Sequence, residues 1–179
     1  VAMLAGLLPD LAGPTPKAAI LAQAMANGAV KVVFVGDSIT EGVADVEPEN
    51  RWSSLFQQSL ERAFPDIAWT FENLSLGARD AGHLADPDYL ALAAEPGDKS
   101  LGFYRAPPGP FPSNSWGGGS QLGGPWRQHV EDEAPDLVVW AHGMNNFVMT
   151  GQEYADAVQG FYDHTQTWAK PPSLALVTT

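Results

Sequence analysis

A serine that could meet a substrate follows directly after an apolar run. Residues 32–35 are apolar without polar alternation, a pattern typical of a strand buried on both faces in a parallel sheet. Gly36 permits a tight turn, and the Asp37 side chain can hydrogen-bond to the backbone of that turn. Ligands of open α/β sheets bind beyond the carboxyl ends of the strands. Ser38 is therefore predicted to lie at a substrate-binding edge, although an ordinary strand-to-loop turn has the same pattern.

Two other blocks of the sequence combine a predicted strand end with small or polar residues. The three blocks are G-D-S-I-T at 36–40, N-L-S-L-G-A at 73–78 and G-M-N-N at 143–146. Because parallel strands place their carboxyl ends at one edge of a sheet, we expect the blocks to converge. Taken singly, Ser38 is also typical of a helix N-cap, Gly77 of a turn, and Asn145 of a cap or turn. The combination is therefore more informative than any one residue.

Together these blocks resemble those of the SGNH (GDSL) hydrolase family, and the first match continues into Glu41 and Gly42. The resemblance covers the chain from about residue 29 to its end, and it implies that Ser38 is the nucleophile of a serine ester hydrolase. It also implies an oxyanion hole formed by the N–H groups of Ser38 and Gly77 and by the side-chain amide of Asn145. These roles make chemical sense, because a tetrahedral intermediate needs donors aimed at its oxygen, glycine lets its N–H approach closely, and asparagine donates without a charge.

Two features depart from the pattern of that family. Asn146 stands where the family commonly has aspartate, so the role of that carboxylate is not carried over. The general base of the family is a histidine in a D-x-x-H segment after the last strand, and no such segment follows the strand predicted at 174–179. Because a serine hydroxyl without a base is a weak nucleophile, we expect a C-terminal segment of the same protein to supply the aspartate and the histidine. The chain begins at Val1 and is expected to be a processed or trimmed piece.

The histidines within the sequence are weaker candidates for the base. The segment D-A-G-H at 80–83 contains His83, but it follows the second block rather than the last strand. His142 is expected to pack or to hydrogen-bond near the site rather than to act as the base, and His129 and His164 are expected to be exposed on helices. A polar loop explains Asp80, His83, Asp86 and Asp88 better than a metal site, because their spacing matches no familiar ligand signature. We expect neither a metal nor a cofactor.

The elements that would carry the three blocks alternate along the chain. Helices are predicted at 17–27, 51–64, 126–133 and 153–168, and strands at 32–35, 67–74, 137–141 and 174–179. Strand–helix–strand order implies right-handed parallel crossovers. We therefore predict a three-layer α/β/α sandwich with a parallel sheet. The resemblance to the SGNH hydrolases implies a flavodoxin-like strand order, and by comparison with that family the last strand and helix are expected to be missing. The prediction is a single domain over 1–179, with a leader and helix at 1–28.

A long irregular segment interrupts this alternation at 96–125. Fourteen of its 30 residues are glycine or proline, a density that helices and sheet interiors do not tolerate. Aromatic residues are scarce in disordered segments, so its five aromatic side chains, counting Trp126, favour a packed loop. We interpret the segment as a lid or rim of the site, with a purely structural loop as the alternative.

Composition excludes several classes of partner. The net charge of −12 argues against a nucleic acid or an anionic membrane surface. The uncharged run at 18–30 is too short and too polar to span a bilayer. The sequence contains no cysteine, which excludes a disulfide framework and a thiolate nucleophile but leaves the compartment open.

The function predicted from these observations is hydrolysis of a short-chain or carbohydrate O-acyl ester, with a small molecule or a glycan ester as the substrate. Trp116 and Tyr104 in the long loop could stack on a sugar. The alternative is a non-catalytic glycan-binding module on the same scaffold. A nucleotide-binding domain is disfavoured, because the turn at 36–40 lacks a glycine-rich phosphate cradle.

Overall fold

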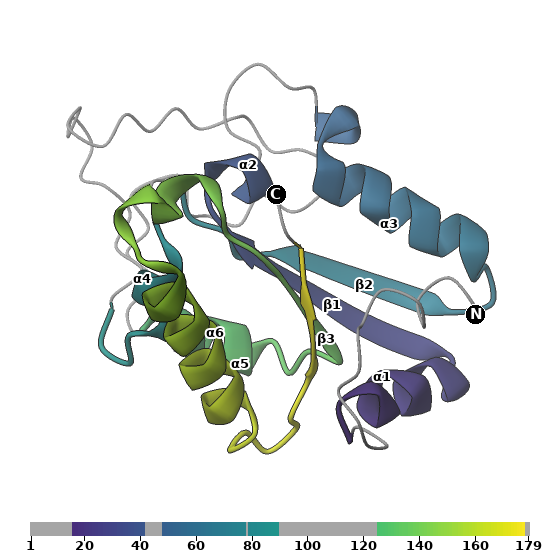
Figure 1. Ribbon diagram of the computed structural model, residues 1–179. Helices are drawn as coiled ribbons and strands as arrows, with labels where there is room; N and C mark the ends of the chain where they lie inside the picture. Colours follow the sequence, from purple (N-terminus) through teal and green to yellow (C-terminus); the bar gives the residue numbers. More distant parts are fainter. Residues whose placement is uncertain (1–15, 42–47, 78, 90–124, 178–179) are drawn as a thin grey trace.

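The computed structural model describes residues 16–41, 48–77, 79–89 and 125–177 (Figure 1). The strands are β1 (Ala29–Gly36), β2 (Ala68–Asn73), β3 (Leu137–Ala141) and β4 (Ser173–Leu176). The helices are α1 (Pro16–Ala26), α2 (Ser38–Glu41), α3 (Trp52–Ala63), α4 (Ala81–Ala85), α5 (Trp126–Asp132) and α6 (Gly151–Thr165). Two 3₁₀ helices, η1 (Pro48–Asn50) and η4 (Met144–Val148), complete the described elements.

The four strands form one parallel sheet in the order β2-β1-β3-β4. This order confirms the flavodoxin-like arrangement predicted from the sequence. The register places Phe34 of β1 beside Asn73 of β2, and Gly36 of β1 beside Ala141 of β3. The carboxyl ends of these three strands therefore finish at the same edge of the sheet, where the three sequence blocks begin.

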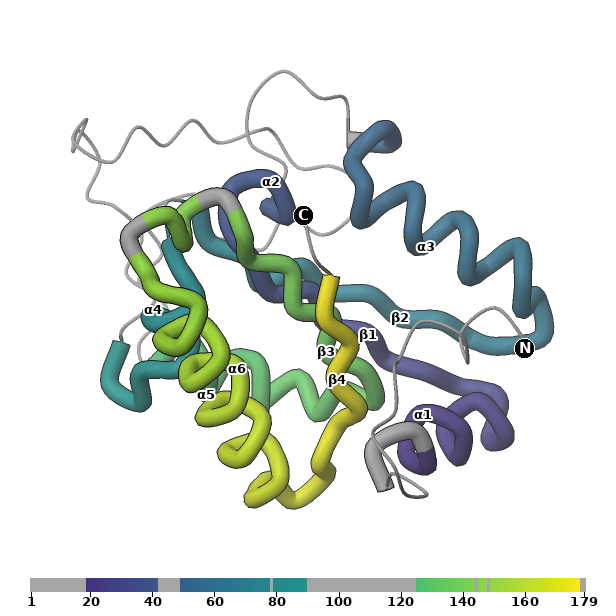
Figure 2. The backbone as a smooth tube through the Cα atoms, in the orientation of Figure 1, coloured from purple at the N-terminus to yellow at the C-terminus, as the bar shows by residue number. Residues whose placement is uncertain are grey.

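Helices cover the sheet on both faces, as the prediction of an α/β/α sandwich requires (Figure 2). Strand residues alternate between two apolar clusters because successive side chains of a strand point to opposite faces. One cluster joins the sheet to α4, α5 and α6 and includes Val33, Val35, Val138, Trp140, Trp126 and Phe161. The other joins it to α1 and α3 and includes Val32, Phe34, Val139, Phe71, Ala24 and Phe56. The absence of polar alternation in β1 and β3 is explained by this burial on both faces.

Helix boundaries differ from the sequence predictions where a cap decides them. Helix α6 begins at Gly151 rather than at 153, because Thr150 accepts a hydrogen bond from the N–H of Glu153 while the Glu153 carboxylate accepts one from the N–H of Thr150. The stretch predicted as a polar loop around Asp80 contains the short helix α4 instead. Asp80 is its N-cap, and its reciprocal partner is His83. A single turn with polar caps has too few apolar positions to show helical periodicity.

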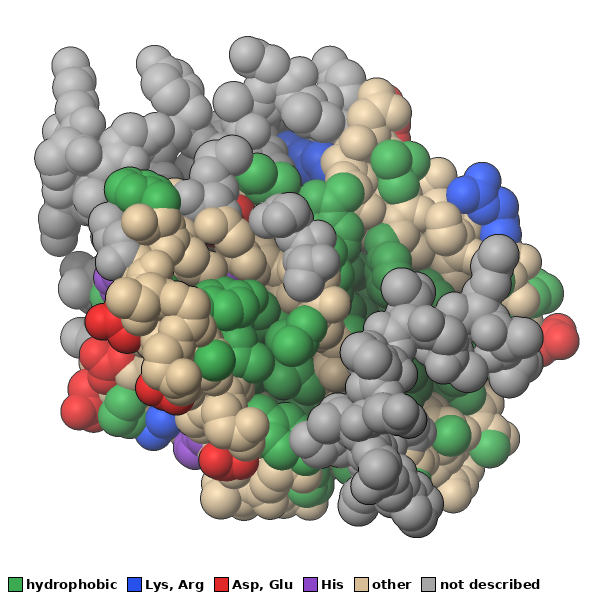
Figure 3. All heavy atoms as spheres, viewed as in Figure 1, with side chains coloured by type: hydrophobic (Ala, Val, Ile, Leu, Met, Phe, Trp, Pro, Cys, Tyr) green, Lys and Arg blue, Asp and Glu red, His purple; other side chains and the backbone are tan. Residues whose placement is uncertain are grey.

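The outer surface is acidic along α6, where the exposed residues Glu153, Asp156 and Asp163 lie. In the space-filling view, apolar side chains gather between α6 and β4 (Figure 3).

None of the described helices is long and apolar enough to cross a membrane. The predicted leader at 1–15 and the loop at 96–124 lie outside the described residues.

Candidate active site at the carboxyl edge of the sheet

Ser38 is the first residue of α2, and only Asp37 separates it from the end of β1. The turn is crowded, since a Cβ atom on Gly36 would lie 2.4 Å from the carbonyl oxygen of Ala141 and 2.4 Å from the hydroxyl of Thr40. Asp37 is buried and holds the turn, as predicted, by accepting a hydrogen bond from the N–H of Ile39 at 3.0 Å. Among the described residues, the hydroxyl of Ser38 has no hydrogen-bond partner. It is therefore positioned by the backbone around it.

Hydrogen bonds tie the three sequence blocks together. The N–H of Leu76 donates to the carbonyl of Gly36 at 2.9 Å, so the second block runs beside the end of β1. Asn73 donates its amide to the carbonyl of Thr40 at 2.7 Å, and the hydroxyl of Thr40 donates to the carbonyl of Ala141 at 3.0 Å. We call this chain of bonds the Thr40 bridge. Asp37 adds a link to the third block, since it accepts a hydrogen bond from the N–H of Gly143 at 3.3 Å. The structure thus brings the three blocks to one edge.

Gly77 is buried within the second block, and its N–H points at a carboxylate. It donates to Oε2 of Glu41 at 2.6 Å. The resemblance to the SGNH hydrolases implied that this N–H faces a substrate oxygen, and it implied no role for Glu41. The structure places Glu41 one helical turn after Ser38, with its carboxylate on the predicted donor.

Asn145 and Asn146 attach η4 to the segment before α4. The side-chain amide of Asn145 donates to the carbonyl of Arg79 at 3.1 Å. The side-chain oxygen of Asn146 accepts a hydrogen bond from the N–H of Ala81 at 3.0 Å. An amide carries two protons, and Arg79 engages one of those on Asn145. Asn146, which stands where the SGNH hydrolases commonly have aspartate, thus makes a hydrogen bond that the sequence did not indicate.

His142 is buried beside the site, between two tryptophan rings. Its ring centroid lies 5.8 Å from that of Trp126 and 5.0 Å from that of Trp140. Within the described part of the chain, neither ring nitrogen has a hydrogen-bond partner. Burial lowers the pKa of His142 from 6.5 to about 4, although the carboxylates of Asp37 and Asp80 act in the opposite direction. His142 packs near the site, as predicted, and is neutral at neutral pH.

The other histidines are held by local contacts. Nδ1 of His83 lies 2.7 Å from Oδ1 of Asp80, within the cap of α4, and its ring packs edge-on against Tyr89. His129 and His164 lie on α5 and α6 as predicted, but both are partly buried rather than exposed. Burial, reinforced by Arg127, lowers the pKa of His164. None of the histidines in the described residues hydrogen-bonds to the Ser38 hydroxyl.

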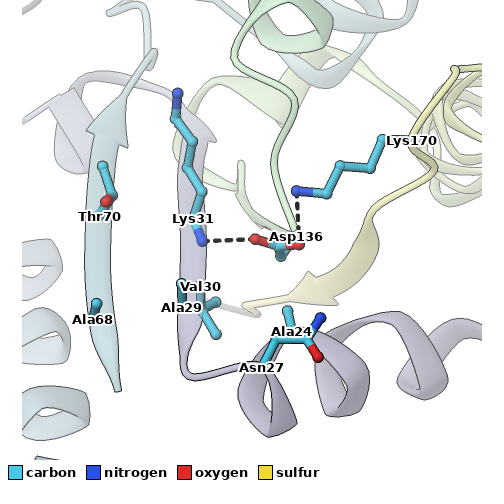
Figure 4. A pocket seen from close by; sticks show the side chains of 9 residues that line it. All are labelled: Ala24, Asn27, Ala29, Val30, Lys31, Ala68, Thr70, Asp136 and Lys170. Atoms are coloured by element: carbon cyan, nitrogen blue, oxygen red, sulfur yellow. Dashed lines mark hydrogen bonds and ion pairs between the residues drawn. The ribbon is translucent and has the colours of Figure 1, made fainter. Parts of the chain in front are cut away.

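A hollow of about 370 Å³ lies at the opposite, amino-terminal edge of the sheet (Figure 4). Ala29 and Ala68, the first residues of β1 and β2, line it. Asp136 accepts a hydrogen bond from the N–H of Lys31 at 2.8 Å and pairs with the ammonium of Lys170 at 2.8 Å. The ammonium of Lys31 pairs with Glu133. This hollow contributes no residue to the site around Ser38. No cluster of three or more potential metal ligands occurs among the residues that the structure describes.

The buried His142 leads to a prediction about acid stability. An imidazole whose pKa is lowered on folding takes up a proton in the unfolded chain first, so the free energy of unfolding should fall as the pH drops from 6.5 towards 4. The loss should approach about 3 kcal/mol at pH 4 and lower, since each pKa unit corresponds to about 1.4 kcal/mol. His142→Phe, which cannot titrate, should flatten this slope in urea unfolding followed between pH 4 and 7. An equal slope in the two proteins would contradict the prediction.

The fold just described is that of a parallel α/β protein in which three sequence blocks meet at one edge of the sheet. No family model matches the sequence, and no curated protein sequence matches it. The structure is similar to that of a two-domain esterase active on acetylated mannans, co-crystallized with mannopentaose, with a TM-score of 0.55 and 17% identity over 88% of this chain. A second crystal structure described as a two-domain esterase active on acetylated mannans gives a TM-score of 0.55 at 17% identity over 88% of this chain and 33% of the other. A family 3 carbohydrate esterase from Clostridium thermocellum gives a TM-score of 0.47 at 16% identity, over 83% of this chain and 60% of that one.

The two similarities with a TM-score of 0.55 show the fold. The chain spans 34% of the length of the esterase structure with mannopentaose. The evidence for the chemistry of this chain therefore lies in its own residues.

Proposed function

We propose that this chain carries the nucleophile and the oxyanion hole of a serine ester hydrolase that acts on a short-chain or carbohydrate O-acyl ester. The observation that carries the proposal is the linkage of the ends of β1, β2 and β3 by the Thr40 bridge. The proposed residues Ser38, Gly77 and Asn145 belong to the three blocks that follow these strand ends. Parallel α/β sheets bind ligands at this edge. The fold shared with an esterase active on acetylated mannans supports the reaction class and the carbohydrate substrate.

In the proposed reaction, Ser38 Oγ attacks the carbonyl carbon of the ester and passes its proton to a general base. The carbonyl oxygen becomes an oxyanion, and the N–H groups of Ser38 and Gly77 and the second amide proton of Asn145 donate to it. Collapse of the intermediate breaks the bond to the alcohol, which leaves with the proton from the base. Water then attacks the acyl-serine in the same way and releases the carboxylic acid.

The general base is proposed to be a histidine outside residues 1–179, paired with an aspartate in a D-x-x-H segment of the same protein. Two observations support this assignment over the histidines present. His83 is engaged in capping α4 through Asp80. His142 is buried, with its pKa lowered to about 4, and so is a poor proton acceptor at neutral pH. A serine hydroxyl without a base reacts slowly, so residues 1–179 alone are expected to be nearly inactive.

A fluorophosphonate probe tests the proposal, because it labels only an activated serine. In the protein that includes the C-terminal segment, mass spectrometry of a proteolytic digest should place the label on Ser38. The probe should not label residues 1–179 alone at a comparable rate. Failure to label the longer protein, combined with retained binding of a mannan or xylan, would favour the glycan-binding module instead.

A further inference from the structure

The carboxylate of Glu41 occupies the donor that the proposed reaction needs. Glu41 Oε2 lies 2.6 Å from the N–H of Gly77, although 36 residues separate them in the sequence. Glu41 is three residues after Ser38 on α2, so both side chains emerge on neighbouring sides of the same turn. The contact is therefore made at the candidate site itself.

A carboxylate oxygen is chemically close to the oxyanion of a tetrahedral intermediate. Both are negatively charged oxygens that accept short, charge-assisted hydrogen bonds from backbone N–H groups. A substrate carbonyl oxygen cannot lie against the N–H of Gly77 while the Glu41 oxygen is there. We propose that Glu41 competes with the substrate for the N–H of Gly77 and must swing away before the oxyanion hole is complete. This inference rests on the proposed function.

The different burial of Gly77 and Glu41 explains why the hydrogen bond between them forms and how it could break. Gly77 is buried, and a buried N–H without an acceptor is costly. Glu41 satisfies that donor when no substrate is present. The Glu41 side chain is only partly buried and sits on a helix of four residues, so it has solvent to move into.

The first arm of the test does not depend on catalysis. The amide proton of Gly77 can be observed by NMR in protein that carries ¹³C-carbonyl leucine and ¹⁵N-glycine, which restricts the spectrum to three Leu–Gly pairs. Its resonance is identified by its loss in Gly77→Ala. A short hydrogen bond to a carboxylate shifts this proton downfield, so Glu41→Ala should move it upfield. Glu49→Ala, an exposed glutamate on η1, should leave it in place. An unchanged Gly77 resonance in Glu41→Ala would overturn the inference.

The second arm measures hydrolysis of an aryl acetate by the protein with its C-terminal segment. Removing the competing carboxylate should raise kcat/KM by about tenfold, the scale set by one charge-assisted hydrogen bond. Glu41→Gln preserves the size of the side chain and guards against misfolding of Glu41→Ala. It should also raise kcat/KM, whereas Glu49→Ala should not change it. A fall in kcat/KM in both Glu41 variants would overturn the inference.

The two arms separate this inference from the proposed function. If wild type and all variants neither hydrolyse the ester nor react with a fluorophosphonate, the proposed function fails. The NMR result would then still report whether Glu41 holds the Gly77 donor, but competition with a substrate would be refuted along with the activity.

Discussion

Replacing Ser38 with alanine should abolish ester hydrolysis and leave the fold intact. The expected loss in kcat is on the order of 10⁶, as for removal of the serine nucleophile of a protease. The fold should survive because the described residues form no hydrogen bond with the Ser38 hydroxyl, so the substitution breaks no hydrogen bond among them. Hydrolysis of an aryl acetate by the protein with its C-terminal segment, together with urea unfolding, measures both effects.

Ser59→Ala is the matched control for this experiment. Ser59 lies outside the three blocks, is exposed on α3, and donates its hydroxyl to the carbonyl of Leu55. It should retain wild-type turnover. If Ser38→Ala also retained most of its turnover, Ser38 would not be the nucleophile.

Asn145→Ala should reduce kcat by about 10²–10³, the usual cost of removing one donor from an oxyanion hole. The reason is the loss of the amide proton proposed to face the substrate oxygen. Asn145→Asp should be at least as damaging, because a carboxylate cannot donate and repels the developing negative charge. Steady-state kinetics on the same ester gives both values.

The hydrogen bond from Asn145 to the carbonyl of Arg79 makes a structural control necessary. Asn146→Ala provides it, since Asn146 makes a comparable bond to the N–H of Ala81 from the same 3₁₀ helix. Asn146→Ala should lower the free energy of unfolding by about 1 kcal/mol. Its kcat should fall far less than that of Asn145→Ala. Equal losses of kcat in the two variants would mean that Asn145 acts only by holding η4 in place.

The sheet could be predicted from the sequence because a strand that is buried on both faces shows this burial as an uninterrupted run of apolar residues. Residues 32–35 and Leu137–Ala141 are uniformly apolar, and both are central strands of the sheet. The parallel direction of the strands followed from their alternation with helices, and the flavodoxin-like order followed from the resemblance to the SGNH hydrolases. The outer strands were predicted less well at their ends: β2 spans Ala68–Asn73 rather than 67–74, and β4 begins at Ser173 and ends at Leu176, before the described residue Val177.

The contacts at the candidate site could not be predicted in the same way. The bond between Glu41 and Gly77 depends on how two turns face each other, and no local pattern records that geometry. The same holds for the bond between Asn146 and Ala81, which joins residues 65 apart in the sequence. His142 was expected near the site, but its lowered pKa arises from burial between two tryptophans that lie on different elements.

Helix α2 consists of four residues, too few to be stable on its own in water. The sheet therefore fixes the position of Ser38 through Thr40. The carbonyl of Thr40 accepts a hydrogen bond from the side-chain amide of Asn73 in β2, and the hydroxyl of Thr40 donates to the carbonyl of Ala141 at the end of β3. A chain that kept G-D-S-I-T but lost either neighbouring strand would keep the motif and lose the hydrogen bonds that hold Ser38 at the edge of the sheet. The motif therefore indicates a site only where both flanking strands are present.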